Sequence, residues 1–470
     1  MGQVEIKFGT DGWRAIIAKE YTVDNVKRVA EATARWMLNN KMDKAVVGFD
    51  CRFGGALFSE TAVQVLCNFG IKVIYDKNFA STPMVSLGVV KMKADMGIVI
   101  TASHNPPSYN GFKLKSAYGG PTIPKDIADV ETIIPDSPLG KLPSLDSFAA
   151  NGLIEYVNLE DLYLTHVEEN FDLDLIRNSN IKLAYDAMYG AGQNVIRRLF
   201  PAAHLLHCEY NPSFQGQAPE PIHRNLSELS QLLKDNDQLN LGLANDGDAD
   251  RIGLYNASGE FVDSHHILLL LLYYLKEYKK YDGKVIITFS VTNKMQQLAE
   301  QYGLELEITK IGFKYIAEIM TKEDVLVGGE ESGGLAVKGH IKERDGIWMG
   351  LVIMEFMAKT GKSLEELISD IYAKVGSFKF DRDDLHIEEA KKWAIMDRCK
   401  EGHITDIGGR PVIKTEDIDG YKFYLSDDEW LMVRPSGTEP VLRVYAHAAD
   451  NAAVRKLLDA GHKSLQEGLA

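Results

Sequence analysis

Short runs of apolar, often β-branched residues alternate along this chain with longer stretches of helical periodicity. The runs 45–49, 72–75 and 97–101 are typical of buried strands, and the stretches 23–37 and 59–69 have the period of amphipathic helices. Strands and helices in this alternation predict parallel sheets covered by helices on both faces, so the expected fold class is α/β. Further predicted strands lie at 181–185, 241–244, 284–289, 304–308 and 325–327.

Breaks in this pattern divide the chain into four predicted domains. Three prolines fall within 135–147, a turn-rich stretch follows at 256–259, and the periodicity is interrupted again at 375–384. The last hundred residues change character, because two strands separated by a polar loop precede a helix at 452–465, which is the pattern of an α+β domain. The predicted domains span residues 1–150, 151–257, 258–376 and 377–470.

Composition and charge limit the classes of partner. The chain has 470 residues, of which 45% are hydrophobic, as in ordinary globular proteins. Its net charge of −15 repels nucleic-acid backbones and anionic lipids, so neither nucleic acid nor a membrane is an expected partner. The longest apolar run, 267–275, is too short for a membrane span of about 20 residues and predicts a buried helix. Four scattered cysteines favour free thiols, and with no signal peptide visible the expected location is cytoplasmic.

The first chemically distinctive loop, residues 101–113, follows a predicted strand and has the sequence TASHNPPSYNGFK. Ligands of open α/β sheets bind at the carboxyl ends of strands, so this position favours a functional site. Ser103 offers a hydroxyl that can carry a phosphoryl group, and His104 offers an imidazole that can manage a proton. The alternative is a serine–histidine turn without function, because the sequence Asn-Pro-Pro that follows is itself a turn signal.

The second loop, residues 245–251, has the sequence NDGDADR after another predicted strand. Its three carboxylates, on Asp246, Asp248 and Asp250, repel one another unless a cation lies between them. Hard oxygen ligands of this kind select Mg²⁺ or Ca²⁺. An EF-hand is excluded, because Arg251 stands where that motif requires glycine. The alternative is an acidic turn that is merely solvated.

A third loop, residues 328–334, surrounds Glu330 and Ser332 with glycines that let the backbone approach a ligand closely. These two side chains could form hydrogen bonds with sugar-like hydroxyls. The signal is weak by itself, because loops of Gly, Glu and Ser are common.

A fourth loop, residues 434–440, has the sequence RPSGTEP between two predicted strands. An arginine with two hydroxyls around a glycine turn can form a phosphate cradle, although a plain hairpin turn is the alternative. Near the amino terminus, Arg14 follows two glycines and gives a weak indication of another anion site.

Together these segments supply a phosphorylatable hydroxyl, a site for a divalent cation, hydroxyl-binding groups and a phosphate cradle, which phosphoryl transfer requires. In this order and spacing, with TASHNP and DGDADR as the most specific motifs, they resemble the α-D-phosphohexomutase superfamily over residues 9–443. That superfamily contains phosphoglucomutases, phosphomannomutases and phosphoglucosamine mutases.

The resemblance implies four domains around a central cleft, of which three are related mixed-sheet α/β domains and the fourth is α+β. It implies that Ser103 is a phosphoserine and that one Mg²⁺ per chain is held by Ser103 together with Asp246, Asp248 and Asp250. Lys113 matches a general acid/base, which as a base would need its pKa lowered by neighbouring arginines and the metal. The other residues with implied roles are His104, Arg14 and Arg251 around the reacting group, and Glu330, Ser332, Arg434, Ser436, Gly437, Thr438 and Arg443 in substrate binding.

The implied activity interconverts hexose 1-phosphate and hexose 6-phosphate, with hexose 1,6-bisphosphate as intermediate and activator. The implied partners are small hexose phosphates, and the chain is expected to be a monomer or a homodimer. Glu331 resembles the glucose-handling branches, whereas phosphoglucosamine mutases usually have Gln there. We therefore expect a phosphoglucomutase, with phosphomannomutase or phosphoglucosamine mutase as alternatives. A metal-dependent sugar phosphatase is a more remote alternative, because it would not need the 434–440 loop. A sugar-phosphate sensor without turnover would be expected to have lost Ser103 or the aspartates.

Overall fold

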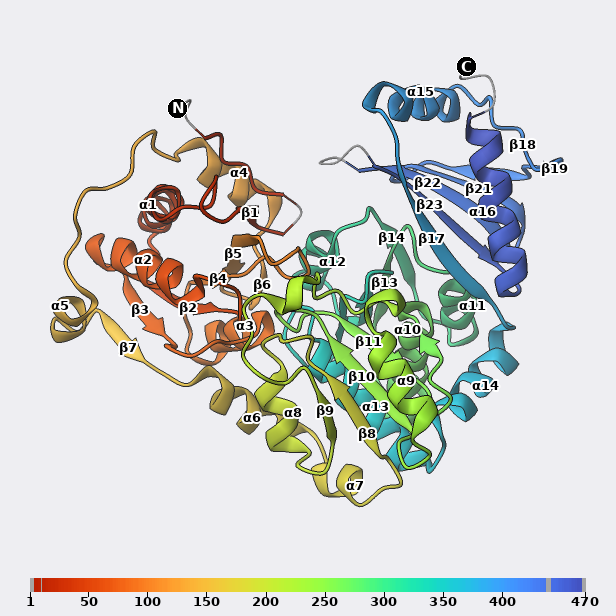
Figure 1. Cartoon of the computed structure of the whole chain (residues 1–470), viewed down its shortest axis with the longest axis horizontal. Helices are drawn as coiled ribbons and strands as arrows, with labels where there is room; N and C mark the ends of the chain where they lie inside the picture. The colour runs from red at the N-terminus through yellow and green to blue at the C-terminus, as the bar shows by residue number, and fades with distance from the viewer. Residues whose placement is uncertain (1–3, 10, 437–440, 467–470) are drawn as a thin grey trace. The chain divides into compact units, whose positions relative to one another are not determined.

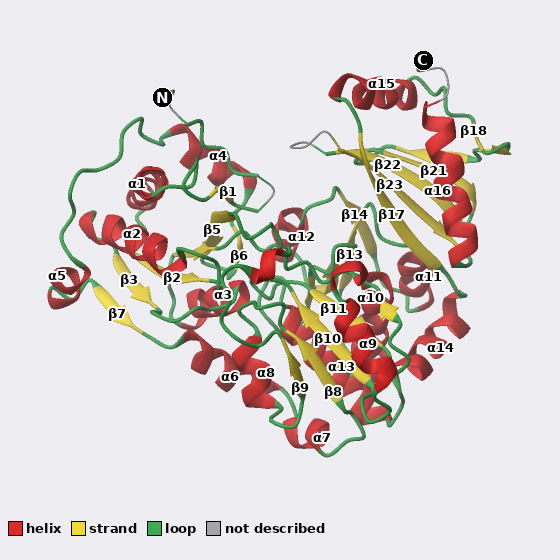
Figure 2. Ribbon diagram, viewed as in Figure 1, coloured by secondary structure: helices red, strands yellow, loops and turns green. Residues whose placement is uncertain are grey.

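The structure, a computed structural model, describes residues 4–9, 11–436 and 441–466. Its contacts divide the chain into two compact units, the first of which contains the chain up to Ile286 together with Gly312–Ile368. The second contains Ile287–Ile311 and the chain from Ser369 onwards. Four larger sheets with their helices (Figures 1 and 2) confirm the predicted four-domain α/β architecture.

The first sheet has seven strands and is mixed. Its strands β2, β3, β4 and β7 run parallel, whereas β5 is antiparallel to both β4 and β1. The order is β1 (Trp13–Ile16), β5 (Tyr109–Ser116), β4 (Met96–Ile100), β2 (Lys44–Phe49), β3 (Lys72–Tyr75) and β7 (Ile154–Tyr156), with β6 (Gly120–Pro121) paired to β5.

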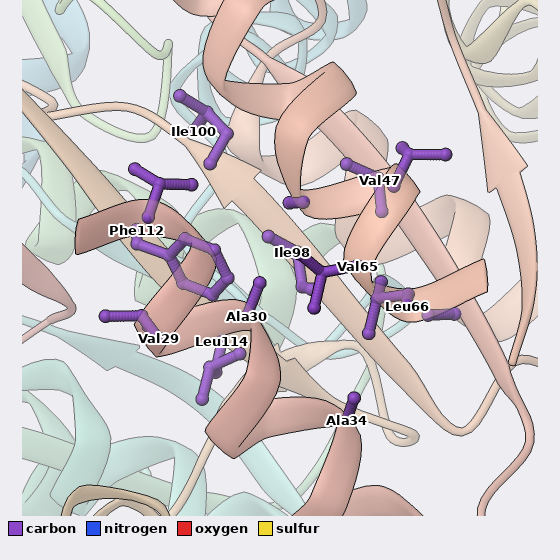
Figure 3. Packing of buried hydrophobic residues seen from close by; sticks show 14 of the residues in the cluster. Val29, Ala30, Ala34, Val47, Val65, Leu66, Ile98, Ile100, Phe112 and Leu114 are labelled. Atoms are coloured by element: carbon purple, nitrogen blue, oxygen red, sulfur yellow. The ribbon is translucent and has the colours of Figure 1, made fainter. Parts of the chain in front are cut away.

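Helices cover both faces of this sheet. Successive residues of a strand point to opposite faces, so Val47 packs into the cluster formed with α1 and α2, whereas Gly48 lies against Val85 of α3. Figure 3 shows residues from two helices, among them Val29 and Leu66, with residues of the strands in that cluster. Burial on both faces explains why these strands are continuous apolar runs in the sequence. The helices here are α1 (Val23–Asn39), α2 (Gly55–Asn68), α3 (Thr82–Lys91), α4 (Pro124–Thr132) and α5 (Leu145–Ala150).

The second sheet is also mixed, as the resemblance implies and in contrast to the parallel sheets that the alternation of strands and helices alone predicts. Strand β8 is parallel to β9 and β10, but β10 is antiparallel to β11. The loop between β10 and β11 is too short for the crossover that a parallel pair requires, so the chain turns back as a hairpin. The order is β12 (Phe261–Val262), β11 (Ile252–Tyr255), β10 (Leu241–Asn245), β8 (Leu183–Asp186) and β9 (His204–Leu206). The helices here are α6 (Leu159–Asn170), α7 (Leu173–Arg177), α8 (Gln193–Leu199) and α9 (Ser227–Asp235), with short 3₁₀ helices η1 (Phe214–Gly216) and η2 (His223–Asn225).

The third sheet is crossed by the boundary between the two units, which falls within β13. The apolar run 267–275 lies in α10 and the π-helical turn η3, and every residue of α10 is buried, as predicted. No helix in the described part of the chain has both the length and the apolar character that a membrane span needs. The strand order is β14 (Leu306–Thr309), β13 (Lys284–Thr288), β15 (Val325–Gly329) and β16 (Leu335–Val337). The helices are α10 (Ser264–Tyr273), η3 (Tyr274–Tyr278), α11 (Lys294–Gln301), α12 (Phe313–Met320), α13 (Gly346–Thr360) and α14 (Leu364–Val375).

The fourth sheet belongs to the second unit, and every pair of neighbouring strands in it is antiparallel, as the α+β prediction requires. The helices α15 (Glu389–Lys400) and α16 (Asn451–Gln466) pack on one face through a cluster that includes Leu431 and Leu458. The strand order is β17 (Lys379–His386), β23 (Val441–Ala448), β22 (Glu429–Pro435), β21 (Tyr421–Ser426) and β20 (Lys414–Glu416), beside a ribbon of β18 (Asp406–Ile407) and β19 (Arg410–Pro411).

Candidate active site

Ser103 lies in the turn between β4 and β5, at the carboxyl end of a buried strand. Its φ of 53° is in the left-handed region, which non-glycine residues seldom adopt and which is enriched at functional sites. The Ser103 hydroxyl donates a hydrogen bond of 2.7 Å to Oδ2 of Asp246, and His104 Nδ1 lies 3.4 Å from the same hydroxyl oxygen. The structure therefore brings the proposed phosphoryl carrier to the acidic loop.

The turn is held by Arg52, a fully buried arginine that the sequence analysis did not single out. Its guanidinium lies 3.4 Å from the carboxylate of Asp50, and Asp50 accepts a 2.5 Å hydrogen bond from the Thr101 hydroxyl. Burial raises the pKa of Asp50 to about 6, although Arg52 lowers it. The sequence does contain a signal for this arginine, because the charged residues Asp50 and Arg52 directly follow the buried run 45–49. Charged residues next to a buried strand need a partner or a function. Arg52 donates hydrogen bonds to the carbonyl oxygens of Ser103 (2.5 Å), Asn105 (2.6 Å), Pro106 (2.9 Å) and Tyr109 (3.1 Å).

The three aspartates of the second loop are all buried, and each offers a carboxylate oxygen within 4.8 Å of the others. Burial, followed by the charges of Asp248 and Asp250, raises the pKa of Asp246 well above its usual range. Oδ1 of Asp248 and Oδ1 of Asp250 have no hydrogen-bond partner among the described residues. Buried, unpaired, mutually repelling carboxylate oxygens fit a hard divalent cation, so this triad could hold a metal ion.

Two contacts fix the acidic loop against its neighbours. A Cβ atom at Gly247 would lie 2.6 Å from the carbonyl oxygen of Ser103, so only glycine allows the two loops to approach this closely. Asp248 accepts a hydrogen bond of 2.5 Å from the Thr82 hydroxyl, and the backbone N–H of Arg251 donates to Asp246 at 3.0 Å. The carboxylates are thereby oriented before any ligand binds.

Lys113, on β5, is fully buried among carboxylates. Its Nζ lies 2.8 Å from Asp248, 2.9 Å from Asp11 and 3.2 Å from Asp250. Burial lowers the pKa of Lys113, but these three charges together raise it well above its usual range. Within the chain itself the carboxylates outweigh burial and Arg344, so the pKa shift of Lys113 is opposite to the one that a lysine base would need from arginines and a metal.

Arg344 is a second cation that the sequence analysis missed. It precedes α13 and lies 2.7 Å from Asp250, and it also contacts Asp11. Lys115 lies 2.6 Å from the neighbouring Glu343, so this charged cluster continues along β5. The sequence signal for Arg344 is the run of charged residues 342–345, which directly precedes the buried apolar helix α13. Asp345 caps the first turn of that helix.

The other residues expected around the reacting group also lie in the first unit. Arg14 donates a hydrogen bond of 2.8 Å to Asn105, and Arg251 lies 3.3 Å from Glu220. Burial lowers the pKa of His104 well below its usual range, and Arg251 and Arg14 lower it further. His104 is therefore a neutral imidazole with one unprotonated ring nitrogen, although the lowered pKa makes it a weaker base than a free histidine.

The third loop meets the second through a β-bridge between Arg251 and Gly334. A Cβ atom at Gly334 would lie 2.5 Å from Cδ of Arg344, so glycine is needed for this approach too. Glu330 is buried, and burial raises its pKa to about 7 despite Arg344 and Arg251. Ser332 is partly exposed. Three of the four loops predicted to be functional thus come together within one unit.

The fourth loop belongs to the second unit. Arg434 and Arg443 are directly opposite each other on β22 and β23, and they lie 3.2 Å from Asp419 and 3.7 Å from Asp384, respectively. Each guanidinium therefore has a carboxylate neighbour, and two guanidinium groups at opposed positions can together also bind an anion such as a phosphate. Ser436 is buried at the end of β22, whereas Gly437 and Thr438 lie outside the described residues.

Comparison with protein families gives four matches that cover most of the chain. The matching families are described as phosphoglucomutase/phosphomannomutase, alpha/beta/alpha domain I for residues 5–139, domain II for 161–259, domain III for 263–375, and C-terminal domain for 387–461.

Individual relatives match over nearly their whole length. A phosphoglucomutase/phosphomannomutase of Thermococcus kodakarensis is 29% identical, covering 98% of this chain and 99% of that protein. A phosphoglucosamine mutase of Methanococcus aeolicus is 31% identical and covers 98% of each chain. The solved structure of a Thermus thermophilus protein assigned to the phosphomannomutases has a TM-score of 0.87 and 31% identity, covering 99% of this chain and 100% of that one. The names of these relatives differ in the sugar that they specify.

Proposed function

The chain belongs to the α-D-phosphohexomutase superfamily, and we propose that it is a phosphoglucomutase-type enzyme. It interconverts hexose 1-phosphate and hexose 6-phosphate through a phosphoserine and a hexose 1,6-bisphosphate, which also serves as activator. The observation that carries this proposal is the 2.7 Å hydrogen bond from the Ser103 hydroxyl to Asp246, one of three buried carboxylates.

In the first half-reaction, the bond between phosphorus and Oγ of phospho-Ser103 breaks, and a free hydroxyl oxygen of the sugar becomes bonded to phosphorus. The hydroxyl proton passes to a base and Oγ regains a proton, so the products are a bisphosphate and a neutral serine. His104, held neutral, suits the base, and Lys113, held as a cation, suits the acid. The second half-reaction returns the other phosphoryl group to Ser103.

The acidic triad and the serine oxygen are proposed to bind one Mg²⁺, which supplies positive charge to the oxygens of the transferring phosphoryl group. Arg14 and Arg251 add further positive charge from the chain itself. The residues proposed to bind substrate are Glu330 and Ser332 for the sugar hydroxyls, and Arg434, Ser436, Gly437, Thr438 and Arg443 for the non-reacting phosphate.

We propose that each of four domains contributes one of these loops. Residues 1–150 contribute the phosphoserine loop, 151–257 the metal-binding loop, 258–376 the sugar-binding loop and 377–470 the phosphate-binding loop. We place the enzyme in the cytoplasm. All four cysteines are buried free thiols, as is usual in a reducing compartment.

Glucose phosphates are the proposed substrates because Glu331 stands between Glu330 and Ser332. A coupled assay of glucose-, mannose- and glucosamine-1-phosphate, with a trace of the matching bisphosphate, is expected to give the highest kcat/KM for glucose 1-phosphate. A preference for glucosamine 1-phosphate would overturn the choice of sugar and leave the mutase mechanism standing. Release of inorganic phosphate without isomerisation would instead support the sugar phosphatase.

Arg434→Ala is expected to raise KM by about 10- to 100-fold with little change in kcat, because its contact is remote from the bond that breaks. Steady-state kinetics with glucose 1-phosphate measure the two constants separately. Arg410→Ala is the matched control, since Arg410 is an exposed arginine of the same unit that pairs with Glu429. An unchanged KM in Arg434→Ala, or an equal rise in both variants, would remove Arg434 from the phosphate site.

A further inference from the structure

The second unit contains a cavity of about 230 Å³ between the segment Ile287–Ile311 and the fourth sheet. None of the residues that line it belongs to the proposed active site. Phe289, Ile308 and Tyr424 form apolar walls, and Lys422 lies among them on β21. A charged residue in such surroundings needs an explanation, because burying a charge is costly.

Lys422 is 3% exposed and projects from the face of the sheet opposite α15 and α16. Its Nζ lies 4.4 Å from the ring centroids of both Phe289 and Trp430, and it donates one hydrogen bond of 2.5 Å to the carbonyl oxygen of Phe289. The described residues give Lys422 no ion pair. Lys414, which also lines the cavity, is already paired with Glu416 at 2.7 Å. Lys422 is thus a buried amine that has no ion pair among the described residues.

Two further polar atoms at this cavity lack partners. Thr288 is completely buried, and its hydroxyl forms no hydrogen bond with any described residue. The side-chain oxygen of Asn293 is also buried and unpaired within the described chain, although its amide nitrogen donates to the carbonyl oxygen of Asp427. Buried polar atoms are normally satisfied, so this combination indicates a ligand with hydrogen-bonding groups of its own.

We propose that this cavity binds a small anion that carries a hydroxyl group. The anionic group pairs with Lys422, and the hydroxyl group binds Thr288 and Asn293. The volume equals that of roughly eight molecules of liquid water, which suits a compound of three or four carbon atoms. Either a phosphate or a carboxylate group could form the ion pair with Lys422. The experiment below distinguishes these two kinds of anion by testing one probe of each. The proposal goes beyond the proposed mutase function and does not depend on it.

Proton uptake provides a signature of this site. Burial lowers the pKa of Lys422 to about 7, while Glu416 raises it and Lys414 lowers it. The other carboxylates that line the cavity, Glu300 and Asp427, are exposed. A bound anion favours the charged amine and raises this pKa, so binding at pH 8 should take up close to one proton.

The test is calorimetric titration of the full chain at pH 8 with glycerol 3-phosphate and separately with glycerate, in two buffers of different ionisation enthalpy. The wild-type protein is expected to bind one of these probes at a single site with uptake of about one proton. Lys422→Met should weaken that binding by about 10- to 100-fold and abolish the uptake, because one charged hydrogen bond is lost. Thr288→Val should weaken it by a few-fold while retaining the uptake. Lys456→Met, on the exposed side of α16, is the matched control and should bind like the wild type.

Met fills much of the same space between the aromatic rings, so Lys422→Met is expected to fold, which circular dichroism checks. If it does not fold, Thr288→Val carries the test. The proposal is overturned if neither probe binds the wild type at millimolar concentration, or if Lys422→Met and Thr288→Val bind like the wild type. Binding that survives in Lys422→Met but is lost in Arg434→Ala would also overturn it, because the probe would then occupy the phosphate site.

Discussion

Ser103→Ala is expected to lower kcat/KM for isomerisation by about 10⁴-fold or more, because the variant has no oxygen to carry the phosphoryl group. Neither His104 nor Lys113 can replace the Ser103 oxygen as the phosphoryl carrier. The carrier atom must lie where the surrounding residues can hold the phosphoryl group during transfer. The Ser103 oxygen lies against Asp246, and the turn around it is fixed by Arg52. The coupled assay measures the loss, and intact mass spectrometry after incubation with hexose bisphosphate measures the phosphoenzyme.

The matched control is Ser108→Ala, which removes a hydroxyl from an exposed position of the same loop. It should retain nearly full activity and should still gain one phosphoryl group. Isomerisation at the wild-type rate by Ser103→Ala would rule out the phosphoserine mechanism. Full phosphorylation of Ser103→Ala at another residue would assign the carrier role elsewhere in the chain.

Much of the fold follows from the sequence, because most strands of the first three sheets are buried on both faces. Continuous apolar runs therefore located β2, β3 and β4 to within a residue or two, and the helix predicted at 23–37 begins with α1 and ends two residues before it. The direction of the strands was harder to predict. The loops after β4 and β10 are too short for the crossover that joins parallel strands, so β5 and β11 return antiparallel. The chemically distinctive residues of these loops conceal this signal.

Some residues of the candidate site could likewise be predicted from the sequence, and others could not. Ser103 and the aspartates could be found because each loop carries an unusual local sequence. Arg52 and Arg344 could not, because their importance lies in contacts with residues far away along the chain. Arg52 binds backbone oxygens of a loop about fifty residues later, and Arg344 pairs with Asp11 near the amino terminus. Buried charges of this kind are visible in a sequence only as polar residues beside apolar runs.

The same long-range contacts explain why the neighbours of Lys113 in the chain raise its pKa, whereas a lysine base would need arginines and the metal to lower it. Arginines close in sequence to the functional loops suggested a positive environment, whereas the atoms nearest to its Nζ are carboxylate oxygens of Asp11, Asp248 and Asp250. The pKa of Lys113 is raised and that of His104 is lowered, which is the divergence that the proposed acid and base roles require.

Asp248→Asn is expected to weaken Mg²⁺ binding at least tenfold and to lower turnover by about 10²- to 10³-fold. The asparagine keeps an oxygen for the Thr82 hydroxyl, but it removes one of three negative charges from the triad. Lys113 retains Asp11 and Asp250 as partners, so the loss should fall on the metal site rather than on the fold. Activity as a function of Mg²⁺ concentration at constant ionic strength gives the affinity.

Thermal unfolding gives a second measurement that does not depend on turnover. A ligand that binds only the folded state raises Tm, so Mg²⁺ should raise the Tm of the wild type and raise that of Asp248→Asn far less. Asp237→Asn is the matched control, because it removes one exposed carboxylate between α9 and β10 and should leave both effects intact. Equal Mg²⁺ stabilisation of Asp248→Asn and the wild type would place the ion elsewhere. Undiminished activity of the variant in the presence of a chelator would contradict a metal role for the triad altogether, because Lys113 and Arg344 would then be the cations that balance the aspartates.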